Sequence, residues 1–381
     1  MRRYLFFAFL GLVACENKGK PESEPAAQET DSTQVVIAAQ VSRHALPFCP
    51  EVYEESIELP ITELKAQQDY IEEEIKQVQS DTIPDFQEKR RRLNELDVAK
   101  SIMIDKLAYK IESICGSVDD SQPVELYDGN LGVSKEFVNS LSKSVGQLQW
   151  KYSFGNQFNS PGDSEGNVKG VRWCSGSLIA KDLFITAGHC FDRSGLSWRL
   201  PKKNGQIISS RQIAQLMKVN FNYQLSAANR QIRADTIDYP VLELKEYRNG
   251  NLDYAIIRLG KDSQGNWPGD KFGIIPISSD TISQVGIAGI IQHPKGNPKV
   301  IEAGPVVFVV ANLLGYNDID TEGGSSGAAV ISAKTNKIVG VHIQGGCDLN
   351  SSNFNSATPI RAILPFSPIL KTLTPNRADL P

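Results

Sequence analysis

From about residue 145 onward, the chain consists of short apolar runs rich in β-branched residues, with no long helical period between them. Gly, Asn, Asp and Pro separate the runs, which is the composition of turns. The clearest runs are residues 177–179, 183–185, 255–257, 306–310 and 338–341. Many short strands without alternating long helices favour an antiparallel sandwich or barrel over a parallel α/β sheet. We therefore predict a mainly β domain.

A helical pattern precedes this region, between about residues 60 and 115. Apolar residues recur there at steps of three and four in two runs, and Pro84 between them suits the first turn of a second helix. The apolar positions are Ile61, Leu64, Ile71, Ile75 and Val78, then Phe86, Leu93, Leu96, Met103, Leu107, Ile111 and Ile114. We predict an antiparallel α-helical hairpin, within a pre-domain of residues 49–118.

Cys49 and Cys115 would both lie at the open end of this hairpin. A disulfide between them is predicted to stabilise the two helices by roughly 2–4 kcal/mol. Apart from Cys15, the chain has five cysteines, which is an odd number, so at least one is free or pairs with another chain.

The N-terminus predicts export. Arg2 and Arg3 precede an apolar run, Tyr4–Ala14, which is too short to span a bilayer but fits a secretory signal. The ending Leu-Val-Ala-Cys resembles the bacterial lipoprotein box, which implies lipidation of Cys15; an ordinary cleaved signal is the alternative. Residues 1–15 are then the signal and residues 16–48 a polar tether. Glu16 favours the outer membrane or periplasm as the location.

Composition excludes some classes of function. The 381 residues have room for roughly two domains, and the 40% of hydrophobic residues can form a core. A formal charge of −4 argues against nucleic-acid binding. The spacing of the four histidines forms no metal motif, so no metal or cofactor is predicted.

Three motifs in the β region carry candidate chemistry: Thr-Ala-Gly-His-Cys ending at Cys190, Asn-Leu-Asp-Tyr-Ala around Asp253, and Gly-Gly-Ser-Ser-Gly around Ser326. Singly, they could be a loop with a buried histidine, a strand cap and a flexible turn. Together, in the order His, Asp, Ser, they resemble the chymotrypsin-like serine peptidase superfamily. The resemblance covers residues 145–370 and implies a double antiparallel β-barrel.

The resemblance implies roles for these residues. His189 would be the general base, Asp253 would orient it, and Ser326 would be the nucleophile, because only Ser326 lies in Gly-x-Ser-Gly. The N–H groups of Gly324 and Ser326 would form the oxyanion hole. Cys174 and Cys190, 16 residues apart, are expected to form a disulfide beside the histidine.

The surroundings of Ser326 resemble the bacterial glutamyl endopeptidases. Thr321 and His342 match the positions that bind an acidic side chain in that group. Asp320 lies six residues before Ser326, where trypsin-like enzymes carry the acid that selects Lys and Arg, so a basic preference stays open. Cys347 is expected to be the odd cysteine, although a bridge to Cys49 or Cys115 stays open.

The sequence therefore predicts a lipid-anchored serine endopeptidase that acts on proteins or peptides, with a preference for acidic residues. The alternative is a non-catalytic, protease-like lipoprotein that binds proteins. The helical hairpin is expected to bind a partner, to act as a spacer, or to cover the active site until it is cleaved.

Overall fold

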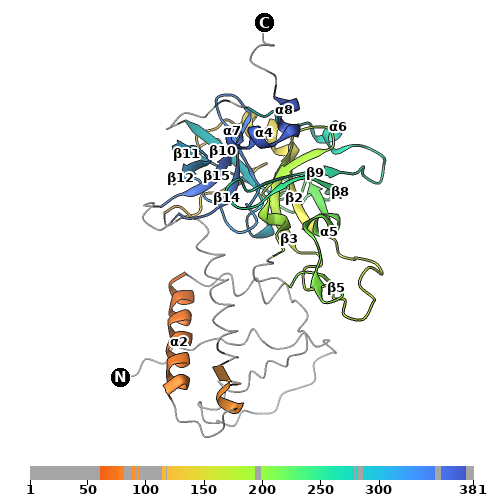
Figure 1. Cartoon of the computed structure of the whole chain (residues 1–381). Coiled ribbons are helices and arrows are strands. Elements are labelled where there is room, and N and C mark those ends of the chain that lie inside the picture. Colours follow the sequence, from red (N-terminus) through yellow and green to blue (C-terminus); the bar gives the residue numbers. More distant parts are fainter. Residues whose placement is uncertain are drawn as a thin grey trace, which may run out of the picture. The chain divides into compact units, whose positions relative to one another are not determined.

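The computed structural model describes residues 61–80, 87–90, 92–93, 96, 114–116, 118–193, 199–278, 280, 286–347 and 353–374. Its contacts divide the chain into two units, residues 1–107 and 108–381. Figure 1 shows the elements of both units. The predicted signal, Cys15, the tether and Cys49 lie outside the described residues.

The first unit contains α2 (Ile61–Ser80), which is the first helix of the predicted hairpin. Ile71 and Val78, two of its predicted apolar positions, are buried. Residues 87–90, 92–93 and 96 are also helical, and Lys89 Nζ donates a hydrogen bond to the Gln79 carbonyl at 2.8 Å. The predicted turn and most of the predicted second helix lie outside the described part. No helix that is described is long and apolar enough to cross a membrane.

The second unit begins its β structure with a closed antiparallel barrel of six strands in the order β2-β3-β4-β9-β8-β7. The strands are β2 (Val145–Trp150), β3 (Arg172–Leu178), β4 (Leu183–Thr186), β7 (Met217–Phe221), β8 (Ile237–Arg248) and β9 (Tyr254–Leu259). Between β4 and β7 lie the hairpin β5 (Lys202–Lys203) and β6 (Gln206–Ile207) and helix α5 (Ser210–Gln215). A capping box between Ser209 and Gln212 begins α5.

A second six-stranded barrel follows, in the order β11-β10-β13-β14-β15-β12, and β12 closes it by pairing with β11. The strands are β10 (Ile287–Gln292), β11 (Val300–Val310), β12 (Leu313–Tyr316), β13 (Ala329–Ser332), β14 (Ile338–Gln344) and β15 (Asn355–Pro359). The predicted chymotrypsin-like double barrel is confirmed.

Residues that precede position 145 also belong to this unit. Strand β1 (Gln122–Pro123) pairs with β11, and helix α4 (Lys135–Leu141), capped by Ser134, buries Phe137 and Leu141. The helices α6 (Pro268–Phe272), α7 (Ile360–Ile363) and α8 (Pro368–Leu373) complete the unit. Sequence periodicity did not predict β1 or α4. The two residues of β1 and the two turns of α4 are too short to show a repeating pattern.

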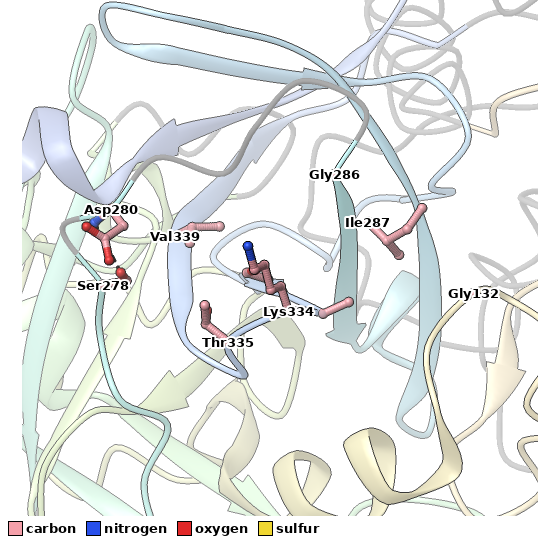
Figure 2. Close-up of a pocket in the computed structure, with 10 residues that line it drawn as sticks. Gly132, Ser278, Asp280, Gly286, Ile287, Lys334, Thr335 and Val339 are labelled. Atoms are coloured by element: carbon pink, nitrogen blue, oxygen red, sulfur yellow. Dashed lines mark hydrogen bonds between the residues drawn. The ribbon is translucent and has the colours of Figure 1, made fainter.

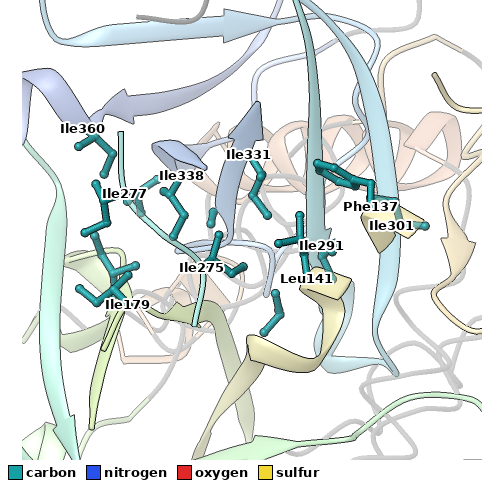
Figure 3. Packing of buried hydrophobic residues seen from close by; sticks show 14 of the residues in the cluster. Phe137, Leu141, Ile179, Ile275, Ile277, Ile291, Ile301, Ile331, Ile338 and Ile360 are labelled. Atoms are coloured by element: carbon teal, nitrogen blue, oxygen red, sulfur yellow. The ribbon is translucent and has the colours of Figure 1, made fainter. Parts of the chain in front are cut away.

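One hydrophobic cluster joins the two barrels (Figure 3). Ile179 and Ile256 come from the first barrel, and Ile291, Ile331 and Ile338 come from the second. Each of these side chains is at most 2% exposed. Burying apolar area contributes about 25 cal/mol per Å², so this shared core fixes the two barrels against each other.

The disulfides differ partly from the prediction. Cys174 pairs with Cys190, as expected. Cys115 pairs with Cys347, so the predicted Cys49–Cys115 bridge is wrong and Cys347 is not the odd cysteine. The reason is that Cys115 lies in the second unit, where its N–H donates to Asp320 Oδ1 at 2.6 Å.

Candidate active site

His189 and Asp253 come together because β4 and β9 are antiparallel neighbours. Thr186 at the end of β4 pairs with Ala255 near the start of β9, so the residues just beyond both ends meet at one edge of the barrel. His189 Nδ1 lies 2.6 Å from Asp253 Oδ2, and the His189 backbone N–H donates to Asp253 Oδ1 at 2.7 Å. Both carboxylate oxygens therefore hold the histidine.

Gly188 is required for this approach. A side chain there would come within 1.9 Å of the Arg248 carbonyl oxygen and 2.9 Å of Asp253 Oδ1. The His189 side chain is 26% exposed and that of Asp253 is 11% exposed. The imidazole is thus open to a substrate while its partner is nearly enclosed.

Ser326 lies on the loop before β13, against the strands that lead to His189. Its carbonyl accepts a hydrogen bond from Ser175 N–H on β3 at 2.9 Å, and it lies 4.0 Å from Cys190 Sγ. A side chain on the following residue, Gly327, would come within 2.0 Å of Thr186 Oγ1. The loop can pack this closely on the first barrel only with glycine at position 327.

The same loop presents two unused backbone N–H groups. The N–H groups of Ser325 and Gly327 donate to the carbonyls of Glu322 and His342, each at 2.8 Å. Within the part of the chain that the structure describes, the N–H groups of Gly324 and Ser326 have no acceptor. Gly324 has φ +95°, a conformation that favours glycine, and a side chain there would come within 2.7 Å of the His293 carbonyl oxygen. Such a pair of donors can stabilise an oxyanion.

Most of the double-barrel region is similar to a known protein family. Residues 174–341 match the model of the trypsin-like peptidase domain. These residues therefore form a domain similar to the trypsin-like peptidases. The resemblance to chymotrypsin-like serine peptidases is confirmed by this match.

Two other proteins show similarity to the chain. The secreted RxLR effector protein 73 of Plasmopara viticola is 27% identical over 269 residues, which cover 67% of this chain. The chain spans 57% of the length of that protein. A structure of Glu endopeptidase in complex with MPD aligns over 66% of this chain and 97% of its own, with 18% identity and a TM-score of 0.41.

Residues outside the predicted catalytic set support the Ser326 loop. Ser175 Oγ donates to the Gly324 carbonyl at 2.8 Å and accepts from His293 N–H at 2.9 Å. Lys295 N–H donates to the Gly323 carbonyl at 2.6 Å. The hydrogen bonds of this Gln-His-Pro-Lys-Gly turn to residues near Ser326 leave no signal in the sequence.

His293 itself is buried, and its Nδ1 lies 3.0 Å from the Asn297 carbonyl oxygen. Burial and the Lys299 ammonium lower the pKa of His293 well below its ordinary value. A neutral, fully enclosed imidazole suits a structural role and not that of the general base.

Two of the predicted specificity residues are buried close to the Ser326 loop. Thr321 is 1% exposed, and its Oγ1 has no hydrogen-bond partner among the described residues. The backbone of His342 bonds in both directions to the loop, at Gly327 and Ala328. Its Nδ1 lies 2.5 Å from the Tyr316 hydroxyl. Burial, and then the nearby His189, lower the pKa of His342 to about 3, so this imidazole is neutral at neutral pH.

Asp320 is held on both its side chain and its backbone. Its Oδ1 accepts from Cys115 N–H at 2.6 Å, and its carbonyl accepts from Gln292 Nε2 at 2.6 Å. Burial raises the pKa of Asp320 to about 7. Glu302 lies nearby on β11, and burial together with neighbouring aspartates raises its pKa to about 10. The Asp320 carboxylate is thus occupied by the segment around Cys115.

A hollow of about 570 Å³ lies elsewhere on the peptidase domain (Figure 2). Gly132, Ser278, Ile287, Lys334 and Val339 are among the residues that line it, and Ser278 Oγ accepts from Asp280 N–H at 3.1 Å. None of its lining residues is a predicted site residue.

Proposed function

We propose that the chain is an active serine endopeptidase in which Ser326 is the nucleophile, His189 the general base and Asp253 the residue that orients His189. The observation that carries this proposal is the double contact of the Asp253 carboxylate with His189, at 2.6 and 2.7 Å. A carboxylate beside Nδ1 favours the tautomer with the proton on Nδ1, in which Nε2 carries no proton and can accept one.

The reaction follows from these positions. Ser326 Oγ attacks the peptide carbonyl carbon while its proton passes to His189 Nε2, and the carbonyl oxygen becomes an oxyanion. The N–H groups of Gly324 and Ser326 stabilise this charge, each contributing about 2.7–4 kcal/mol in related systems. His189 then protonates the leaving amine, and an acyl-enzyme remains. Water, deprotonated by His189, hydrolyses the ester and restores Ser326.

The residues proposed to bind the substrate side chain are best suited to an acidic residue. Thr321 Oγ1 is a buried hydroxyl that no described residue hydrogen-bonds, and a substrate carboxylate would satisfy it. His342 would supply a second donor, and a bound carboxylate would favour its protonation. Asp320 is bonded to Cys115 N–H, which argues against its use in selecting Lys or Arg.

The decisive test of catalysis uses a fluorophosphonate, which reacts with an activated serine. Labelling of the full chain followed by peptide mapping should place the label on Ser326, and Ser326→Ala should abolish both labelling and peptide hydrolysis. Ser325→Ala, at the adjacent serine, is the control and should still be labelled. A wild-type protein that takes up no label would instead support a non-catalytic, protein-binding role.

Specificity is tested separately with peptides that differ only in the residue before the cut. We expect cleavage after Glu to exceed cleavage after Lys or Leu. Thr321→Val removes the hydroxyl with little change of shape and should lower kcat/KM for the Glu peptide by roughly 10–150-fold, the worth of one hydrogen bond to a charged group. Preferential cleavage after Lys would exclude the acidic pocket.

The location of the enzyme is a further part of the proposal. A lipid on Cys15 would hold the chain on the outer face of a bacterial membrane, in the outer membrane or periplasm, with the polar residues 16–48 as a tether. Incorporation of labelled fatty acid by the wild type, and its loss in Cys15→Ser, is the expected result. Labelling that persists in Cys15→Ser would refute it.

A further inference from the structure

Three carboxylates from distant parts of the chain meet beside the loop that carries Thr321. Asp119 follows Cys115, Glu302 lies on β11, and Asp320 precedes Thr321. One carboxylate oxygen from each lies within 4.8 Å of the others. The pairing of Gln122 with Ile301 brings the first two segments together, because it joins β1 to β11 next to both residues.

The burial of the Glu302 carboxyl group is the feature of this cluster that the packing of the fold does not explain. Its side chain is fully buried. The backbone N–H of Asp320 lies near the carboxylate, but neither oxygen has a hydrogen bond of good geometry in the described part of the chain. None of the three carboxylates forms an ion pair with a described Lys or Arg. Burying a carboxyl group without a partner costs several kcal/mol unless a proton or a cation satisfies it.

We propose that Asp119, Glu302 and Asp320 bind a calcium ion. Calcium takes carboxylate oxygens at about 2.3–2.6 Å, so two ligands of one ion lie at most about 5 Å apart, which the cluster meets. The set contains only oxygen donors, whereas zinc prefers nitrogen and sulfur. The exposed side of the site, at Asp119, leaves room for water to complete the coordination.

The other cluster of possible metal ligands is unsuitable. Cys174, His189 and Cys190 also lie within 4.8 Å of one another, but the two cysteines are joined in a disulfide and offer no thiolate. The chemistry of the donors therefore favours the carboxylate cluster.

Calcium would link three segments of the peptidase domain. The ion would tie residues 119–120 and β11 to Asp320, whose carboxylate already accepts from Cys115 N–H. Because Thr321 follows Asp320 directly, the site would also fix the base of the proposed substrate pocket. That last consequence rests on the proposed function, whereas the binding of the ion does not.

The binding is measured by calorimetry with CaCl₂ on the full chain carrying Ser326→Ala, after treatment with EDTA. This background prevents self-cleavage and makes the result independent of catalysis. We expect one site with a Kd on the order of 10⁻⁵–10⁻³ M and a higher Tm in calcium than in EDTA. MgCl₂ at the same concentration should give a smaller response, and an equal response would overturn the assignment to calcium.

Variants identify the ligands. Glu302→Gln keeps the size of the side chain and should weaken calcium binding at least tenfold. Asp119→Asn changes an exposed residue, so it should weaken binding while leaving Tm in EDTA unchanged. Glu243→Gln, on an exposed position of β8, is the matched control. Absence of a saturable response at about 5 mM CaCl₂, or wild-type affinity in both ligand variants, would overturn the proposal.

Discussion

The two barrels of the peptidase domain place their ionisable groups differently. The first barrel holds His189 and Asp253 at the ends of β4 and β9, with the histidine partly exposed and paired to the carboxylate. The second barrel holds His293, Glu302, Asp320 and His342, all at most 4% exposed. Burial shifts the pKa of each of these four toward the neutral form.

This difference separates two tasks. A general base must exchange protons with substrate, which requires access and a charged partner. Residues that shape a pocket or hold a loop can be enclosed. Their N–H, O–H and carboxyl groups act through hydrogen bonds whose direction the fold sets. The first barrel is therefore expected to respond to substitutions mainly in kcat, and the second in kcat, specificity and stability together.

The largest effect is expected at Asp253 in the first barrel. Asp253→Asn keeps an oxygen for the His189 N–H but presents an NH₂ group to Nδ1, which favours the wrong tautomer. We expect kcat to fall on the order of 10⁴-fold with an unchanged Tm. Asp182→Asn, which removes an exposed ion pair with Arg258 in the same barrel, is the control for peptide hydrolysis assays. A loss of less than tenfold in Asp253→Asn would refute the assigned role.

The two disulfides allow the stabilisation from a short closed loop and from a long one to be compared. Cys174–Cys190 spans 16 residues and Cys115–Cys347 spans 232, so loop closure predicts about 3 and about 5 kcal/mol of stabilisation respectively. Urea unfolding of the paired Cys→Ser variants, followed by tryptophan fluorescence, measures both. A larger loss from the short loop than from the long one would contradict this account.

In the second barrel, Gly324→Ala should impair the proposed oxyanion hole. The added methyl group would meet the His293 carbonyl at 2.7 Å and force the Gly324 N–H away from its direction. We expect kcat to fall about 10²–10³-fold. Gly205→Ala is a matched control, since Gly205 also has a positive φ but nothing within 4 Å of the added atom. Similar losses of kcat in both variants would show a general folding effect.

Per pH unit, the smallest effect is the pH dependence of stability due to His342. Its pKa is about 3 in the folded protein and 6.5 in the unfolded chain. Between these two pH values the unfolded chain therefore binds more protons. The contribution of His342 is fully present above pH 6.5 and decreases by about 1.4 kcal/mol per pH unit as the pH falls toward 3. Urea unfolding from pH 7 to 4 should show a shallower slope in His342→Gln. An unchanged slope would mean that burial does not keep this imidazole neutral.

The sequence predicted the parts of the molecule that depend on local pattern. The motifs around His189, Asp253 and Ser326 pointed to the double barrel, and the turn residues between short runs pointed to strands. Long-range pairing was not predictable in the same way. The partner of Cys115 depends on β1 and β11 lying together, and the burial of Glu302 depends on the closure of the second barrel. Neither leaves a periodic signal in the chain.

The Cys115–Cys347 bond has a consequence for proteolytic processing. A single cut anywhere between these two residues would leave both fragments covalently joined, and they would separate on a gel only after reduction. A cut before Cys115 would instead detach the upstream chain from this bond and leave the peptidase domain with a new N-terminus. The bond therefore divides the sequence into a part that can be shed by one cleavage and a part that tolerates being nicked.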